Sequence, residues 1–330
     1  MRFGFPISRR RQKALGIGLG VGLAGAVALA FRYGLRRTAR VPIPEDISPA
    51  IFARRLASTP HGDMVYHISG SGEPVLFLHG IYPGASSFEW SRVYPRFVME
   101  REVLAADLLG FGESERPGAR MDASDYAESL AGFLLEACPG RQPVIVASGR
   151  TAGIALLLAS RHPERIGALV LIVPQVGTGR VPWASPGLVL ASRIPPLGRF
   201  LYRFSMAREP FLGTWLARFG YADPSRAGED VARNLAICAQ QAGADHAILS
   251  TLGGRFAVDV ASRIGRVPHR VTVLAAAGDT AAQALAAKLP SAVFVPLNPC
   301  GELAPLELAD EISDALSPQL GGSSSFQGAA

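Results

Sequence analysis

The chain has few cysteines and few charged residues for its length. Its 330 residues include three cysteines, Cys138, Cys238 and Cys300, which lie far apart without metal-ligand spacing. An odd, sparse count argues against a disulfide framework. We therefore predict neither a metal site nor a bound cofactor. Charged residues make up 18% of the chain and hydrophobic residues 48%, which is the composition of a globular protein with a sizeable core.

The excess of positive charge is mostly local. The formal net charge is +6, and arginines and a lysine crowd the first 40 residues, beside an apolar segment. Arginines near such a segment are expected to face lipid headgroups, at about 1 kcal/mol each on an anionic surface. The charge therefore predicts membrane lipid as a partner and does not predict nucleic acid.

Residues 14–31 form an 18-residue run without charge. As a helix this run spans about 27 Å, close to the roughly 30 Å hydrocarbon core of a bilayer. Five glycines dilute its hydrophobicity. Our main prediction is a single-pass anchor, with the side of the membrane left open. A cleaved signal peptide ending near Ala28-Leu29-Ala30, and a disordered or interfacial leader, are the alternatives.

Short apolar strands alternate with helical patterns through the rest of the chain, which predicts a mostly parallel α/β sheet with helices on both faces. The helical stretch 175–266 is too long for a connection, so it predicts a cap inserted after a strand. The full predicted order is a basic N-terminus 1–13, an anchor 14–31, a linker 32–61, core 62–174, cap 175–266, core 267–316 and a disordered tail 317–330.

Three motifs in order carry a family resemblance. They are His79-Gly80, the segment Asp107-Leu-Leu-Gly-Phe-Gly-Glu-Ser114, and His162-Pro163-Glu-Arg before an apolar strand. With these motifs the chain resembles the α/β-hydrolase family, in the subgroup with a helical cap. The resemblance implies a nucleophile on a sharp strand-to-helix elbow, an oxyanion hole, an acid and a histidine base.

The residues at these positions are not those of a serine hydrolase. Counting from the flanking strand and from His162-Pro163 places Gly149 at the nucleophile position. The resemblance places Asp279 at the acid position and Glu302 at the histidine position. The N–H groups of Ile81 and Arg150 would form the oxyanion hole.

No histidine follows Asp279 in the chain, so no shift of register supplies the base. Ser148 is the alternative nucleophile, although it lies one residue before the nucleophile position, where its side chain would point in another direction. Asp279 and Glu302 could instead form a carboxylate pair with one raised pKa, able to act as acid or base. A structural role, or pairing with a cation such as Arg150, is equally open.

The predicted cap is rich in Leu and Phe, which indicates packing on the core or a groove for an apolar ligand. We predict a membrane-anchored pseudoenzyme: a non-catalytic binding or assembly module for an apolar ligand or a membrane protein partner. The alternative is an active enzyme, either an esterase-like hydrolase using Ser148 or a lyase or isomerase using Asp279 and Glu302.

Overall fold

A computed structural model describes residues 52–177, 181–259 and 267–320. The predicted anchor, residues 14–31, lies outside these ranges and stays a prediction. Within them, no helix has both the length and the apolar character needed to cross a membrane.

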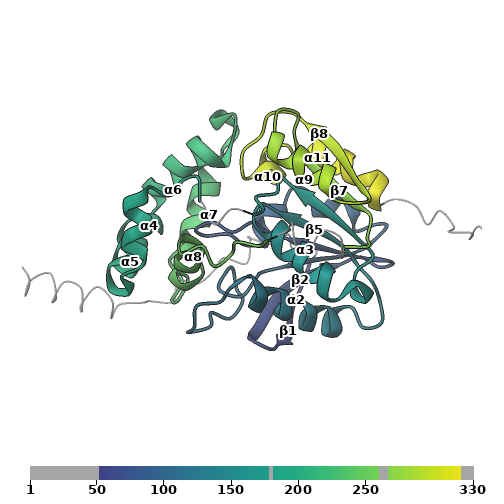
Figure 1. The fold of residues 1–330 in the computed structure, drawn as a ribbon, viewed down its shortest axis with the longest axis horizontal. Helices are drawn as coiled ribbons and strands as arrows, with labels where there is room; N and C mark the ends of the chain where they lie inside the picture. Colours follow the sequence, from purple (N-terminus) through teal and green to yellow (C-terminus); the bar gives the residue numbers. More distant parts are fainter. Residues whose placement is uncertain (1–51, 178–180, 260–266, 321–330) are drawn as a thin grey trace, which may run out of the picture. The chain divides into compact units, whose positions relative to one another are not determined.

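The centre of the fold is an eight-stranded sheet in the order β1-β2-β4-β3-β5-β6-β7-β8 (Figure 1). The β1–β2 and β2–β4 pairs are antiparallel, and all pairs from β4 to β8 are parallel. The predicted mostly parallel sheet is confirmed. The strands are β1 Ala53–Thr59, β2 Gly62–Ser69, β3 Pro74–Leu78, β4 Glu102–Ala106, β5 Val144–Ser148, β6 Ala168–Ile172, β7 Val271–Ala276 and β8 Ala292–Leu297.

Strand β1 lies inside the stretch 32–61 that we predicted to be a linker. It pairs along its whole length with β2, from Ala53 opposite Ile68 to Thr59 opposite Gly62. Ala57 is its one buried residue, so the strand lacks the alternating apolar pattern that identifies strands in sequence. The backbone hydrogen bonds of the hairpin, rather than a buried face, define this edge strand.

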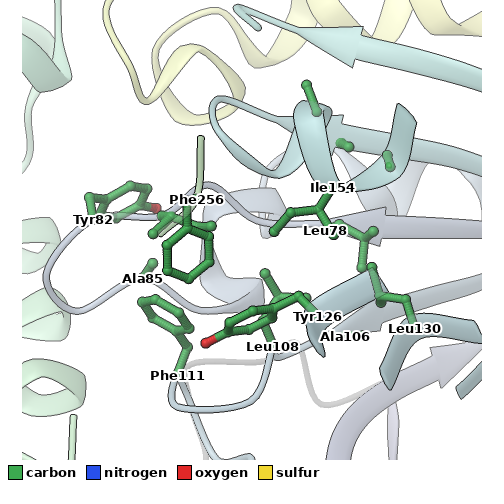
Figure 2. Close-up of a cluster of buried hydrophobic side chains, with 14 of the residues drawn as sticks. Leu78, Tyr82, Ala85, Ala106, Leu108, Phe111, Tyr126, Leu130, Ile154 and Phe256 are labelled. Carbon is green, nitrogen blue, oxygen red and sulfur yellow. The ribbon is translucent and has the colours of Figure 1, made fainter. Parts of the chain in front are cut away.

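Alternate residues of the central strands pack on opposite faces of the sheet. Val75 and Phe77 of β3 belong to one buried cluster, with Trp90 and with Ile312 of α11 (Ala309–Leu320). Leu78 of β3 belongs to the other cluster, which also holds helices α2 (Ala123–Ala137) and α3 (Thr151–Arg161). Figure 2 draws part of this second cluster. Helices therefore cover both faces, as predicted.

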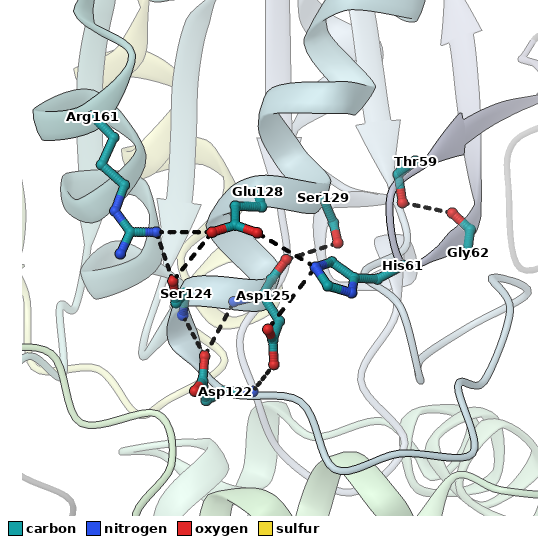
Figure 3. Close-up of polar contacts among 9 residues, drawn as sticks. All are labelled: Thr59, His61, Gly62, Asp122, Ser124, Asp125, Glu128, Ser129 and Arg161. Atoms are coloured by element: carbon teal, nitrogen blue, oxygen red, sulfur yellow. Dashed lines mark hydrogen bonds and ion pairs between the residues drawn. The ribbon is translucent and has the colours of Figure 1, made fainter.

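Helix α2 is fixed to the β1–β2 hairpin by polar contacts (Figure 3). Asp122 accepts hydrogen bonds from the N–H groups of Ser124 (2.8 Å) and Asp125 (3.1 Å), and the Asp125 carboxylate accepts one from Asp122 N–H (2.8 Å). This reciprocal arrangement is a capping box. His61 of the hairpin turn lies 3.9 Å from Asp125 and 3.7 Å from Glu128. The contacts join an edge of the sheet to a helix of the core.

The segment between β6 and β7 is helical, as the predicted cap requires. Its helices contact one another, and buried apolar side chains such as Tyr202, Leu212 and Ile248 join it to the main core cluster. The helices are α4 Pro186–Ser192, α5 Pro195–Leu201, α6 Glu209–Trp215, α7 Glu229–Ala239 and α8 Asp245–Leu252.

The second part of the core carries α9 (Thr280–Lys288), α10 (Ala304–Glu307) and α11, with α9 and α11 beside β7 and β8 (Figure 1). Helix α11 runs to Leu320, so the first residues of the predicted disordered tail are helical. Leu316 and Leu320 are buried, which explains why the helix continues past Ser317.

Candidate active-site region

Gly149 occupies a sharp strand-to-helix turn between β5 and α3, with a φ of +55°. Its N–H donates to the Ile172 carbonyl (3.0 Å), and its carbonyl accepts from Gln175 N–H (3.0 Å). A Cβ built on Gly149 would meet only the Gly80 Cα, at 3.8 Å. The turn has the shape of a nucleophile elbow and leaves space where a nucleophile side chain would lie.

Ser148, the alternative nucleophile, ends β5 with its side chain fully buried. Its hydroxyl makes no well-aligned hydrogen bond. It nevertheless lies close enough to the Glu89 carboxyl to lower the pKa of that group. Ser148 therefore faces the interior beneath the turn, beside a carboxyl and without a histidine.

Glu89 is a site residue that the sequence analysis did not identify. It belongs to the 3-10 turn η2 (Ser87–Trp90) and is almost fully buried. Its Oε2 accepts hydrogen bonds from Gly80 N–H (2.8 Å) and from the Tyr82 hydroxyl (2.7 Å), while its Oε1 is buried without a partner. Burial raises the pKa of Glu89 to about 7, against the opposing effect of the nearby donors. A carboxyl thus stands beneath the predicted oxyanion loop.

Tyr82 connects this loop to the cap. Its ring stacks on Trp215 of α6, with centroids 5.0 Å apart and planes at 23°. Burial and the Glu89 carboxyl raise the pKa of Tyr82 well above its ordinary value. Tyr82 is therefore a neutral hydrogen-bond donor at neutral pH.

The two predicted oxyanion-hole positions differ in their surroundings. Ile81 is buried, and its N–H donates to no other residue in the described part of the chain. Arg150 is buried at the start of α3, where burial lowers the pKa of its guanidinium and Glu302 raises it. The loop, through Gly80, and the start of α3 both lie beside Gly149.

Glu302 lies in the loop that follows β8, which is fixed to the cap by its backbone. Its N–H donates to the Phe219 carbonyl (2.8 Å), and the next N–H, of Leu303, donates to Gly220 (2.9 Å). Burial raises the pKa of Glu302 to about 7, while a hydrogen bond from Gln175 and the charge of Arg150 oppose that rise. Glu302 in turn raises the pKa of Glu89.

Asp279 has a different role in the structure. Its carboxylate accepts hydrogen bonds from the N–H groups of Ala281 and Ala282, both at 3.0 Å, and so caps helix α9. It is not among the groups that shift the pKa of Glu302. The carboxyl whose pKa Glu302 raises is that of Glu89, which lies in the first part of the core, far from Glu302 along the chain.

His79, the histidine of the first motif, has both ring nitrogens engaged. Its Nε2 accepts from Leu108 N–H (3.0 Å), so the proton is on Nδ1, which donates to the Gly80 carbonyl (2.7 Å). Burial lowers its pKa. All six histidines are described, and none of them hydrogen-bonds to Ser148, Glu89 or Glu302. No imidazole is therefore placed to activate a hydroxyl at the elbow.

Within residues 52–177, 181–259 and 267–320, no group of three or more histidine, cysteine or acidic side chains is arranged to hold a metal ion. The polar groups placed at the described site are the Glu89 and Glu302 carboxyls, the Tyr82 hydroxyl and backbone donors.

Comparisons with known proteins agree with this geometry. Residues 73–227 match the family model described as the alpha/beta hydrolase fold. The 2-hydroxymuconate semialdehyde hydrolase of Pseudomonas sp. (strain CF600) is 41% identical over 107 residues, covering 32% of this chain. A haloalkane dehalogenase of Agrobacterium fabrum is 30% identical over 105 residues, again 32% of the chain. The matches span only 38% and 34% of those curated relatives, respectively.

Solved structures match over most of the chain. A 2-hydroxy-6-oxo-6-phenylhexa-2,4-dienoate hydrolase of Rhodococcus sp. strain RHA1 superposes with a TM-score of 0.67 at 21% identity, covering 82% of this chain and 99% of that one. A membrane phospholipase A, described as a bacterial virulence factor, gives a TM-score of 0.66 at 20% identity, covering 95% and 100%. At these identities the structures show the fold alone. Together with the family model, they show that the chain has the α/β-hydrolase fold.

Proposed function

We propose that this protein binds a mainly apolar small molecule in the space in front of Gly149 and does not hydrolyse it through a serine nucleophile. The observation that carries the proposal is the elbow itself. Gly149 keeps the left-handed turn of a nucleophile position, with room for an added Cβ, but offers no attacking atom. The turn has the shape that holds a nucleophile but lacks the nucleophile itself, which supports ligand binding rather than acyl transfer.

The missing base supports the same conclusion. A serine hydroxyl needs a neighbouring base of suitable pKa, and Glu302 takes the place of that base. Ser148 is fully buried, so a substrate carbonyl would have to enter the sheet to reach it. The hydrolase names of the relatives therefore do not transfer to this chain.

The polar groups of the site indicate the head group of the ligand. Glu89 and Glu302 are acceptors when ionised, and Glu89 has an oxygen without a partner. Such a site favours a ligand that donates hydrogen bonds, such as an alkyl alcohol or amine, over a carboxylate. The predicted anchor, residues 14–31, would place this site near a source of such molecules in a membrane.

Acid–base chemistry at the carboxyls is the second candidate. Burial raises the pKa of both Glu89 and Glu302 to about 7. A carboxyl with such a pKa can give or take a proton near neutral pH. This candidate replaces the predicted Asp279–Glu302 pair by Glu89 and Glu302. It would make the protein a lyase or isomerase rather than a hydrolase.

Binding can be tested by calorimetric titration of the full chain with octylamine, octanol and octanoate. We expect the amine and the alcohol to bind and octanoate to bind at least tenfold more weakly. Gly149→Leu should abolish binding because the new side chain fills the space. Gly140→Leu is the matched control, since Gly140 has a φ of +68° and open space in a turn after α2. Unchanged binding by Gly149→Leu would refute the proposed site.

A further inference from the structure

The cap carries a cluster of exposed apolar side chains. Eight large apolar residues are exposed in the described part of the chain, and four of them lie within 15 residues of the cap. These four are Leu190 (63% exposed), Ile194 (52%), Leu197 (37%) and Phe204 (45%). We call this set the cap face.

Part of the cap face lies on one continuous element. Helix α5 leads directly into the π-helical turn η5 (Tyr202–Met206). Leu197 of α5 and Phe204 of η5 are therefore exposed on one continuous helical element. Gly198, Tyr202 and Met206 of the same element are buried. The exposed side chains are thus the apolar edge of a segment whose buried residues pack into the cap.

The cap face lies on the outer helices of the cap. Helices α4 and α5 pack on α8, and Figure 1 shows them on the outer side of the cap. Gly198 of α5 lies so close to α8 that an added Cβ would meet Leu249 at 3.0 Å. The apolar edge therefore has no described element to cover it.

The segment that carries the cap face is basic. Residues 181–208 contain Arg193, Arg199, Arg203 and Arg208 and no acidic residue. Among the described residues, only Arg199 of these four forms an ion pair, with Asp245 (3.3 Å). An apolar edge in a basic segment complements an anionic lipid surface, where apolar side chains enter the headgroup region and arginines contact phosphates.

We infer that the cap face docks on the surface of a bilayer that contains anionic lipids. A second copy of this chain fits less well, because a symmetric contact would bring the same arginines together without acidic partners. The inference is independent of ligand binding at Gly149. Docking would place the cap at the bilayer surface whether or not residues 14–31 cross it.

A fluorophore sensitive to polarity tests this docking in the full chain. In a Cys300→Ser background, Leu190→Cys labelled with a nitrobenzoxadiazole dye reports on the cap face, because Cys138 and Cys238 are buried. Met99→Cys is the control label, since Met99 is 89% exposed in the core domain, outside the cap. The vesicles contain phosphatidylcholine with or without phosphatidylglycerol.

We expect the Leu190 label to shift to the blue and brighten severalfold on vesicles with phosphatidylglycerol, and to respond less with phosphatidylcholine alone. The Met99 label should not change. Arg193→Glu with Arg203→Glu should reduce the response of the Leu190 label. An unchanged Leu190 label on anionic vesicles would overturn the inference, as would a shift without lipid that grows with protein concentration.

Discussion

The segments 79–90 and 298–308 each carry a buried glutamate, Glu89 and Glu307, but use it differently. In the loop 298–308, Glu307 accepts hydrogen bonds at both oxygens, from Asp223 N–H (2.8 Å) to Oε1 and from Gly301 (2.8 Å) and Ala222 (3.1 Å) to Oε2. In the segment 79–90, Glu89 accepts hydrogen bonds at Oε2 only, and its Oε1 has no well-aligned donor although the Ser148 hydroxyl lies nearby. The first carboxylate joins the cap to the core. The second leaves an acceptor beside the elbow.

This difference separates a structural group from a candidate functional one. A buried carboxylate with every oxygen satisfied stabilises the loops that surround it. A buried carboxyl with an unmet oxygen and a raised pKa costs stability at neutral pH, which a protein tolerates where the group serves binding or chemistry. The predictions below test the two halves of this contrast.

The largest effect is expected at Glu307. Glu307→Ala should lower the free energy of unfolding by about 3 kcal/mol, because three backbone N–H groups lose their acceptor at roughly 1 kcal/mol each. Urea denaturation measures this change. Glu311→Ala is the control, since Glu311 accepts two hydrogen bonds at an exposed position and should cost much less. Equal losses in the two variants would contradict the structural role of Glu307.

Glu89 should make stability depend on pH in the opposite sense from an ion-paired carboxylate. Its folded pKa of about 7 lies above the ordinary 4.5, so its stabilising proton is fully bound below pH 4.5. Stability is then lost as the pH rises through 7, by at most about 3 kcal/mol for this group. Glu89→Gln mimics the protonated form, and should match the wild type at pH 4.5 and exceed it at pH 8.

The comparison for Glu89→Gln is made by urea denaturation at both pH values. Ser148→Ala keeps the glutamate and should retain the loss of stability between pH 4.5 and pH 8. If Glu89→Gln showed the same pH dependence as the wild type, Glu89 would be ionised throughout and the contrast with Glu307 would fail.

The smallest effect is expected at Gly149. Gly149→Ala should cost about 1–2 kcal/mol from the left-handed φ alone, since the added Cβ meets open space. Gly112→Ala is the matched comparison, because Gly112 has a φ of +47° but its Cβ would lie 2.0 Å from Asp107 Oδ2. Thermal denaturation should show a much larger loss for Gly112→Ala. Similar losses would show that the space in front of Gly149 is filled.

The framework could be predicted from the sequence because short local patterns encode it. The His79-Gly80 loop and the turn at Gly149 depend on glycines and on flanking apolar strands, which are visible one segment at a time. The family resemblance predicted that Glu302 stands in place of the histidine. Its coupling to Arg150 is present in the structure.

Glu89 could not be predicted in the same way. Its carboxyl meets Gly80, Tyr82 and Ser148 only after the turn η2 packs against β3 and β4, and no spacing rule encodes that contact. One acidic residue between Phe88 and Trp90 is the only signal in the sequence. Asp279 shows the opposite problem. The family resemblance predicts a catalytic acid at its position, whereas in the structure its carboxylate caps helix α9.

The most direct test of the central claim is labelling of the full chain with a fluorophosphonate probe, together with turnover of nitrophenyl butyrate. We predict no labelling and no turnover for the wild type, because Gly149 offers no nucleophile and no histidine lies beside Ser148. Gly149→Ser with Glu302→His restores the missing groups and is the positive comparison. Labelling of the wild type that Ser148→Ala abolishes would contradict the account.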